Sequence, residues 1–220
     1  MVREDLFFRF GAFGEEIERK HRTSEIPPAE LLDQLVCAME VRLPLQDTER
    51  IHSVGRLLID YFSMRGDLQY LNHPIRVAAS LIEYMPEVQA NEGMLALVHN
   101  LFERTDGIGL PEVNSLAGSS VLAAIRLLNI DRRHERDTQY LSQYYAEIRQ
   151  AGRSIRVLKA LDKLDNLLGW TVKVVDPFYY DVILKHVLPM LERQDECLRH
   201  YLKGLLFYVL EFEPHITAVE

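Results

Sequence analysis

The chain has 220 residues, 48% apolar and 26% charged, which is typical of one soluble globular domain with short additions. Its 25 Lys and Arg against 33 Asp and Glu give a formal charge of −8, which argues against binding to nucleic-acid backbones or anionic membranes. The charged N-terminus is unlike a signal peptide, and no apolar run approaches the roughly 20 residues of a membrane-spanning helix. The chain has two cysteines, Cys37 and Cys197, which are far apart in the sequence and have no His or Cys neighbours at ligand spacing. This excludes a disulfide framework and a zinc knuckle, and we expect reduced thiols in a cytoplasmic protein.

Apolar residues recur at helical spacing along nearly the whole chain, beginning after an aromatic N-terminal stretch. We expect that stretch to cover the core or to contact a second subunit in a homodimer; it contains Phe7, Phe8, Phe10 and Phe13. The residue pattern predicts one helix over 29–41, behind two prolines, and another from Asp47–Thr48–Glu49 to near Gly66. Further helices are expected at 73–85, 93–104, 111–128, 137–150, 154–168, 177–193 and 195–210.

Local signals fix some of the predicted helix ends. Asp137 or Thr138 is expected to cap one helix, and Gly152 is the expected C′ glycine at its other end. Only Trp170–Val175 has the composition of a strand, and we interpret it as a loop or a helix start. The sequence therefore predicts an all-α fold of about eight to ten helices.

Three segments place polar side chains inside otherwise apolar helical patterns, where a polar group costs free energy unless it is paired or bound. His99 and Glu103 are four residues apart and share one helix face, as do Lys159, Asp162 and Asn166 on another helix. Two imidazoles and a carboxylate from three helices could converge on one metal ion. A set of buried polar residues that hydrogen-bond across helices explains the same pattern, and spacing alone leaves both interpretations open.

Taken together, the segments resemble the HD-domain metal-dependent phosphohydrolases, most closely the alarmone (ppGpp) hydrolases of the RelA/SpoT type. The resemblance rests on Tyr70-Leu71-Asn72-His73-Pro74, on the Ala96–Thr105 segment and on Lys159–Asn166, in the order found in that family. It implies an HD-like helical bundle over residues 45–170. A helical extension over 1–44 would precede the bundle, and C-terminal helices over 171–220 would pack on the same domain.

The resemblance also implies roles for individual residues. The metal-ligand positions correspond to His73, His99, Asn100 and Asp162. Glu103 corresponds to the first residue of the family's acidic catalytic pair. The substrate-binding positions correspond to Arg65, Lys159 and Asn166. The implied cofactor is a divalent metal such as Mn²⁺, and the implied partner is a nucleotide or another phosphorylated small molecule.

Two departures from the family pattern bear on activity. Asn100 replaces an aspartate, which removes one negative charge from the ligand set and weakens the binding of a hard cation. Arg104 replaces the second acid of the catalytic pair, where metal-bound water is activated. We therefore expect weakened or lost hydrolysis with a retained nucleotide or phosphate pocket. The alternatives are an active phosphohydrolase with an unusual Asn ligand, and a non-catalytic regulatory or structural module.

Overall fold

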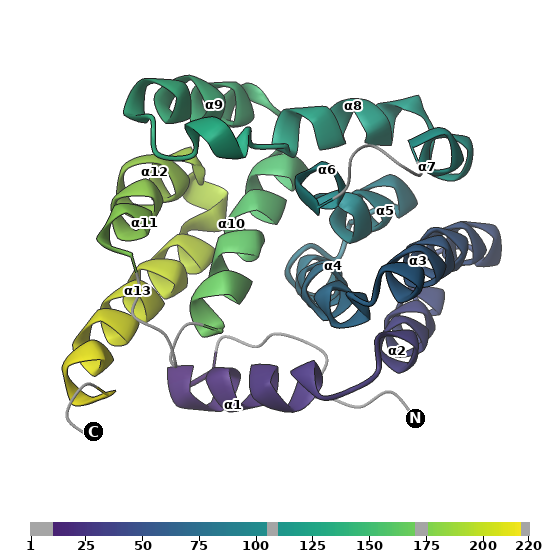
Figure 1. Ribbon diagram of the computed structural model, residues 1–220, viewed down its shortest axis with the longest axis horizontal. Helices are drawn as coiled ribbons and strands as arrows, with labels where there is room; N and C mark the ends of the chain where they lie inside the picture. Colours follow the sequence, from purple (N-terminus) through teal and green to yellow (C-terminus); the bar gives the residue numbers. More distant parts are fainter. Residues whose placement is uncertain (1–10, 105–109, 170–175, 217–220) are drawn as a thin grey trace. The chain divides into compact units, whose positions relative to one another are not determined.

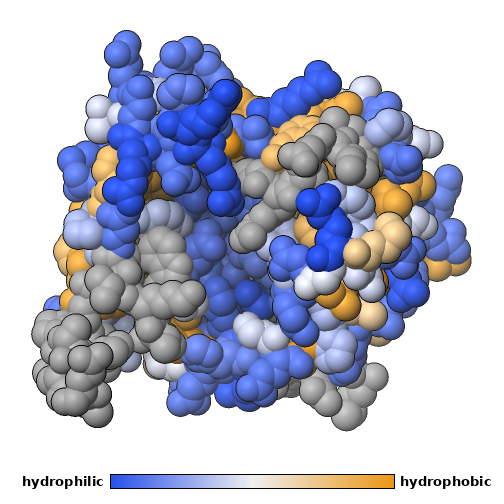
Figure 2. Space-filling view, in the orientation of Figure 1, coloured by the Kyte–Doolittle hydropathy of each residue, from blue (hydrophilic) through white to orange (hydrophobic). Residues whose placement is uncertain are grey.

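The computed structural model describes residues 11–104, 110–169 and 176–216, and it describes side chains over 11–102, 111–169 and 176–211 (Figure 1). All regular elements in these ranges are helices, so the predicted all-α class is confirmed. No helix among them is both long and apolar enough to cross a membrane. On the face drawn in Figure 2, hydrophilic side chains predominate and hydrophobic ones are scattered among them.

The described chain forms two compact units. The first comprises residues 22–131, and the second combines residues 11–21 with residues 132–216. Helix α1 (Phe13–Ser24) therefore begins in the second unit and ends in the first. The other helices of the first unit are α2 (Pro28–Glu40), α3 (Leu45–Arg65), α4 (Asn72–Tyr84), α5 (Ala90–Val98), α6 (Leu101–Arg104), α7 (Leu110–Ala117), α8 (Ser119–Leu128) and the short 3₁₀ helix Leu68–Leu71.

Helices α2 to α5 pack around the core of the first unit. Leu32 of α2 and Ile51 of α3 are both fully buried. These helices approach closely at Gly55, where a Cβ atom would collide with both terminal methyl groups of Leu32. Gly66 ends α3 with φ +71°, a left-handed conformation that glycine adopts without steric cost. The helix thus ends at Gly66, near the end that the sequence predicted.

The second unit is built around α10 (Arg153–Leu168) and the long α13 (Glu196–Ile216), which lie side by side (Figure 1). The ring centroid of Phe13 lies 5.0 Å from that of Tyr201 and 5.2 Å from that of Tyr208. The first part of α1 therefore packs on α13. Phe7, Phe8 and Phe10 lie outside the described residues. The remaining elements are Arg132–His134 (3₁₀), α9 (Thr138–Gln150), α11 (Pro177–Val182), Ile183–Val187 (a π-helix), α12 (Leu188–Met190) and Arg193–Asp195 (3₁₀).

Several predicted boundaries are corrected. The helix expected over 111–128 is divided at Gly118, whose φ of +89° is incompatible with a continuous helix. The helix expected over 177–193 is interrupted by the π-helix and ends at Met190. Gly152 has φ −58° rather than the left-handed conformation, and it serves as the N-cap of α10. Asp137 caps α9 as expected, since its carboxylate accepts from two backbone amides. The segment Trp170–Val175 lies outside the described residues.

Candidate metal and substrate residues

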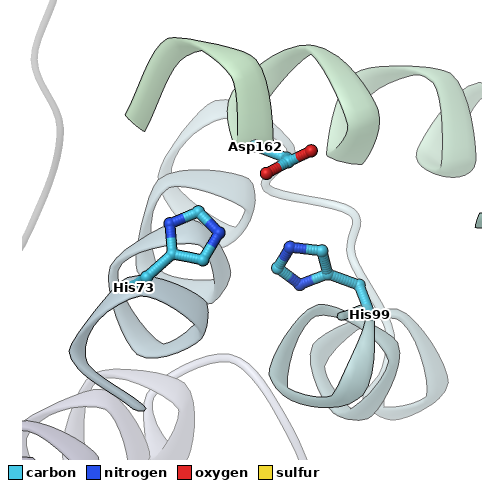
Figure 3. Close-up of side chains that lie close together, drawn as sticks. All are labelled: His73, His99 and Asp162. Atoms are coloured by element: carbon cyan, nitrogen blue, oxygen red, sulfur yellow. The ribbon is translucent and has the colours of Figure 1, made fainter. Parts of the chain in front are cut away.

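Two of the predicted metal ligands lie on neighbouring helices of the first unit. His73 occupies the first turn of α4, and His99 follows the last residue of α5 (Figure 3). Their ring centroids are 5.4 Å apart, with 58° between the ring planes. His99 is only 2% exposed, whereas His73 is half-buried. The packing of α4 against α5 thus brings the two predicted imidazoles together.

A backbone hydrogen bond defines the tautomer of His99. Its Nδ1 lies 2.6 Å from the carbonyl oxygen of Ala96, and because a carbonyl can only accept, Nδ1–H must donate. The second ring nitrogen, Nε2, then carries a lone pair. A histidine held in this way by a backbone carbonyl has the orientation and tautomer of a typical metal ligand.

Asn100 is a hydrogen-bond donor to the predicted site. Its Nδ2 lies 3.2 Å from Nε2 of His73, so the amide donates to this ring nitrogen. The hydroxyl of Tyr70 donates to the backbone carbonyl of Asn100 at 3.4 Å. An asparagine here satisfies His73 with a hydrogen bond, whereas a negatively charged carboxylate at the same position would attract a cation.

Asn72, which the sequence analysis did not single out, fixes the start of α4. This buried side chain directs Nδ2 toward the carbonyl oxygens of Ser24 and Ile26, both at 3.0 Å, and that of Thr23 at 3.4 Å. It therefore ties the α1–α2 connection to the residue just before His73. The sequence shows an asparagine beside a histidine. It shows neither the burial of that asparagine nor the three carbonyls that it contacts.

In the second unit, Asp162 projects from α10 (Figure 3) within a buried group of charged and polar side chains on one face of the helix. Its Oδ2 lies 3.4 Å from Nζ of Lys159 and 3.2 Å from Nζ of Lys163. Its Oδ1 accepts a hydrogen bond from Asn166 at 3.0 Å. Lys159 and Asp162 are each 2% exposed. The spacing of three and four residues along α10 thus gathers the three predicted residues Lys159, Asp162 and Asn166, as expected.

One tyrosine ring lies over each of these two lysines. The sequence analysis did not identify these tyrosines. Nζ of Lys159 lies 5.5 Å from the ring centroid of Tyr144, and Nζ of Lys163 lies 5.3 Å from that of Tyr179. Burial raises the pKa of Tyr179 well above its usual value, although Lys163 acts in the opposite direction. The phenol is therefore protonated at neutral pH. The tyrosines come from α9 and α11, so no local spacing connects them with Lys163.

The remaining predicted site residues are Arg65 and Glu103. Arg65 is exposed in the last turn of α3, where its guanidinium donates to the hydroxyl of Tyr61 at 2.8 Å and lies over the same ring. The backbone of Glu103 belongs to α6, but its side chain and that of Arg104 lie outside the described part of the chain.

Comparisons with known proteins leave the family open. No family model, no curated protein and no solved structure matches this chain.

Proposed function

We propose that this chain is an HD-type phosphohydrolase-like protein, similar to the alarmone hydrolases, with weak metal binding and reduced or lost hydrolysis. The observation that carries the proposal is the pair of imidazoles, His73 and His99, 5.4 Å apart on neighbouring helices. The backbone contact of His99 supports it, because Nδ1–H donation places the lone pair of the neutral ring on Nε2, the nitrogen that a metal would bind in this proposal.

In this proposal Asp162 is the third ligand. His73, His99 and Asp162 each offer one donor atom of a kind that transition metals bind. Mn²⁺ or a similar ion suits two imidazoles and one carboxylate better than Mg²⁺, which prefers oxygen ligands. The ammonium groups of Lys159 and Lys163 already contact the carboxylate of Asp162. A metal ion would share Asp162 with them, so we expect modest affinity.

The substrate in this proposal is a nucleotide or another phosphorylated small molecule, with Lys159, Asn166 and Arg65 on its binding side. Glu103 would position the attacking water, and Asn100 cannot supply the negative charge that its aspartate counterpart gives the metal. The bond from Asn100 to His73 Nε2 also favours a second candidate, a metal-free regulatory module whose polar groups satisfy one another.

Metal analysis separates the two candidates. Protein purified without chelator or affinity metal is analysed for bound elements and then titrated with Mn²⁺ by calorimetry. We expect about one ion per chain, and we expect loss of binding in His73→Ala. His52→Ala is the matched control, because His52 is a partly exposed histidine of the same unit. Its Nε2 lies 3.4 Å from Oδ1 of Asp33. Absence of binding at millimolar Mn²⁺, or equal binding by His73→Ala, would favour the regulatory module.

A restoring substitution tests the cause of weak binding. Asn100→Asp adds a carboxylate beside His73, so it should raise Mn²⁺ affinity by about tenfold or more. The double variant Asn100→Asp/Arg104→Asp should in addition release pyrophosphate from ppGpp, measured by chromatography of the nucleotide products. Unchanged Mn²⁺ affinity in Asn100→Asp would show that ligand charge is not the limiting feature.

A further inference from the structure

The first turn of α4 carries His73, and the side chain of the preceding residue, Asn72, holds that turn to the α1–α2 connection. Asn72 is 3% exposed. Its Nδ2 lies 3.0 Å from the carbonyl oxygen of Ser24 and 3.0 Å from that of Ile26. The connection is itself fixed by packing, because Thr23 is fully buried and Ile26 nearly so. The start of α4 is therefore bonded to a well-packed part of the first unit.

The start of α4 has no side-chain cap. The residue before the helix is Leu71, whose apolar side chain cannot accept a hydrogen bond from the first backbone amides. Nδ2 of Asn72 also lies 3.1 Å from Oε1 of Gln69, in the 3₁₀ helix that leads into α4. Arg76, four residues after Asn72 and buried on the same face, donates to the hydroxyl of Ser24 at 3.2 Å. Side-chain amide and guanidinium groups thus take the place of a cap at this helix end.

The position of the His73 ring depends on this helix end, whereas the ring of His99 has a restraint of its own. His99 is bonded through Nδ1 to the carbonyl of Ala96 on α5. Figure 3 shows the two rings facing each other from their separate helices, and their centroids lie 5.4 Å apart. A side chain moves with its own backbone, so a shift of the first turn of α4 changes this separation directly. A shift of about 1 Å is enough to impair a metal site.

We propose that Asn72 is a positioning residue for the imidazole pair: by donating to the α1–α2 connection, its amide sets the place of the His73 ring relative to that of His99. As a statement about metal binding, the inference rests on the proposed function, in which both imidazoles bind Mn²⁺. Among the residues that the structure describes, none donates a hydrogen bond to Oδ1 of Asn72. Leucine, which has a similar size, therefore removes the amide donors without removing any other hydrogen bond of this side chain.

The first measurement uses the full chain without metal. Nuclear Overhauser contacts between the ring protons of His73 and His99 are recorded, with the signals assigned from His73→Ala and His99→Ala. The wild type should show the contact, and Asn72→Leu should lose it. Asn72→Gln, which keeps the amide donors on a longer side chain, should recover part of it. Ser80→Ala is the matched control on the same helix, because the buried hydroxyl of Ser80 donates to the carbonyl of Arg76 at 2.8 Å. It should keep the contact.

The second measurement is the Mn²⁺ titration, made at a temperature at which circular dichroism shows each variant to be folded. Asn72→Leu should bind Mn²⁺ about tenfold more weakly, because losing a group that orients a metal-binding histidine typically weakens binding by roughly 10–100-fold. Gly55→Ala destabilises the same unit at the α2–α3 contact, and it should bind Mn²⁺ like the wild type. If Asn72→Leu does not fold, Asn72→Ser replaces it, since its shorter side chain cannot reach the same carbonyls. The expected losses are then in the same direction and smaller.

The inference is overturned if folded Asn72→Leu or Asn72→Ser keeps both the ring contact and the Mn²⁺ affinity of the wild type. It is equally overturned if Ser80→Ala loses the ring contact, or Gly55→Ala the Mn²⁺ affinity, to the same extent. These outcomes leave the Mn²⁺ titration of the wild type and His73→Ala unaffected. Conversely, a wild type that binds no Mn²⁺ but shows a ring contact dependent on Asn72 would reject the metal centre and retain the positioning of the two imidazoles.

Discussion

The stacked rings of Tyr145 and His186 join α9 to the π-helix of the second unit. Their centroids lie 5.2 Å apart, with only 10° between the ring planes. Burial lowers the pKa of His186 below its usual value of 6.5, and the charges of Arg149 and Lys185 lower it further. His186 is thus held in its neutral form more strongly in the folded chain than in the unfolded one.

This depressed pKa predicts a dependence of stability on pH. The unfolded chain takes up the proton first as pH falls below 6.5, so the stabilisation is present above that value and is lost toward the lower folded-state pKa. His186→Phe keeps an aromatic partner for Tyr145 but cannot be protonated. Thermal unfolding at about pH 7.5 and about pH 5.5 should therefore show a smaller loss of melting temperature in His186→Phe than in the wild type. His200→Phe, an exposed position on α13, should lose as much as the wild type; an equal loss in all three proteins would contradict the prediction.

Sequence spacing predicted candidate residues well only where they share a helix. Lys159, Asp162 and Asn166 meet because positions three and four apart on α10 face the same way. The contacts of Lys163 with Tyr179 and of Asn72 with the carbonyls near Ser24 join distant segments, and only the packing of helices reveals them. The tautomer of His99 depends on one backbone carbonyl at the end of α5, which no residue pattern encodes.

Close approach between helices makes two glycines of this chain differ in their tolerance of substitution. Gly55 lies against Leu32 where α2 and α3 pack together, and a Cβ atom would overlap the leucine side chain. Gly14, in the first turn of α1, has only the Tyr208 hydroxyl at 3.8 Å from the place of a Cβ atom, which is an ordinary contact. The first position lacks space for a methyl group, whereas the second has it.

The same substitution should consequently have opposite effects at the two positions. Gly55→Ala should lower the free energy of unfolding by about 1–3 kcal/mol, because the packed α2–α3 contact must separate. Gly14→Ala should raise it by about 0.5 kcal/mol, because alanine restricts the unfolded chain and favours the helix. Midpoints of urea unfolding followed by circular dichroism measure both. A stabilising Gly55→Ala would show that Leu32 can move aside at little cost.

Helix periodicity predicted the class and the approximate position of most helices, and it was wrong where continuity depends on backbone conformation. Residues 111–128 have an uninterrupted apolar stripe, yet Gly118 turns the chain and separates α7 from α8. Residues 183–187 have helical periodicity too, and the apolar pattern does not distinguish their wider π turn from an α-helical one. Asp137 was predicted correctly because a side-chain cap is local chemistry.

At the scale of the whole molecule, the two compact units are not consecutive along the chain. The second unit takes residues 11–21 from the beginning of the described chain and residues 132–216 from its end. The N-terminal piece carries Phe13, which packs on Tyr201 and Tyr208, and Lys20, which pairs with Asp165 at 3.1 Å. The fragment 132–220 by itself therefore lacks part of its own packing surface.

Complementation in trans tests this division. We expect the fragment 132–220 to have a low melting temperature and to be stabilised by a peptide of residues 9–21, because the peptide binds the folded form of the fragment. The matched peptide with Phe13→Ala should give little or no increase, since it lacks the ring that contacts α13. Thermal unfolding with increasing peptide concentration measures the effect. A fragment that is equally stable with and without the peptide would show that residues 9–21 are dispensable to this unit.

The early position of Phe13 and the late position of its partners affect how the chain folds during synthesis. The hydroxyl of Tyr201 donates to the carbonyl of Gly11, a residue made 190 positions earlier. At roughly 5–20 residues per second, the ribosome needs about 10–40 s to extend the chain from one to the other. The start of α1 leaves the exit tunnel long before α13 exists, and the first unit can close in the interval. A chaperone that holds exposed aromatic segments of nascent chains would have its longest window of action on this helix.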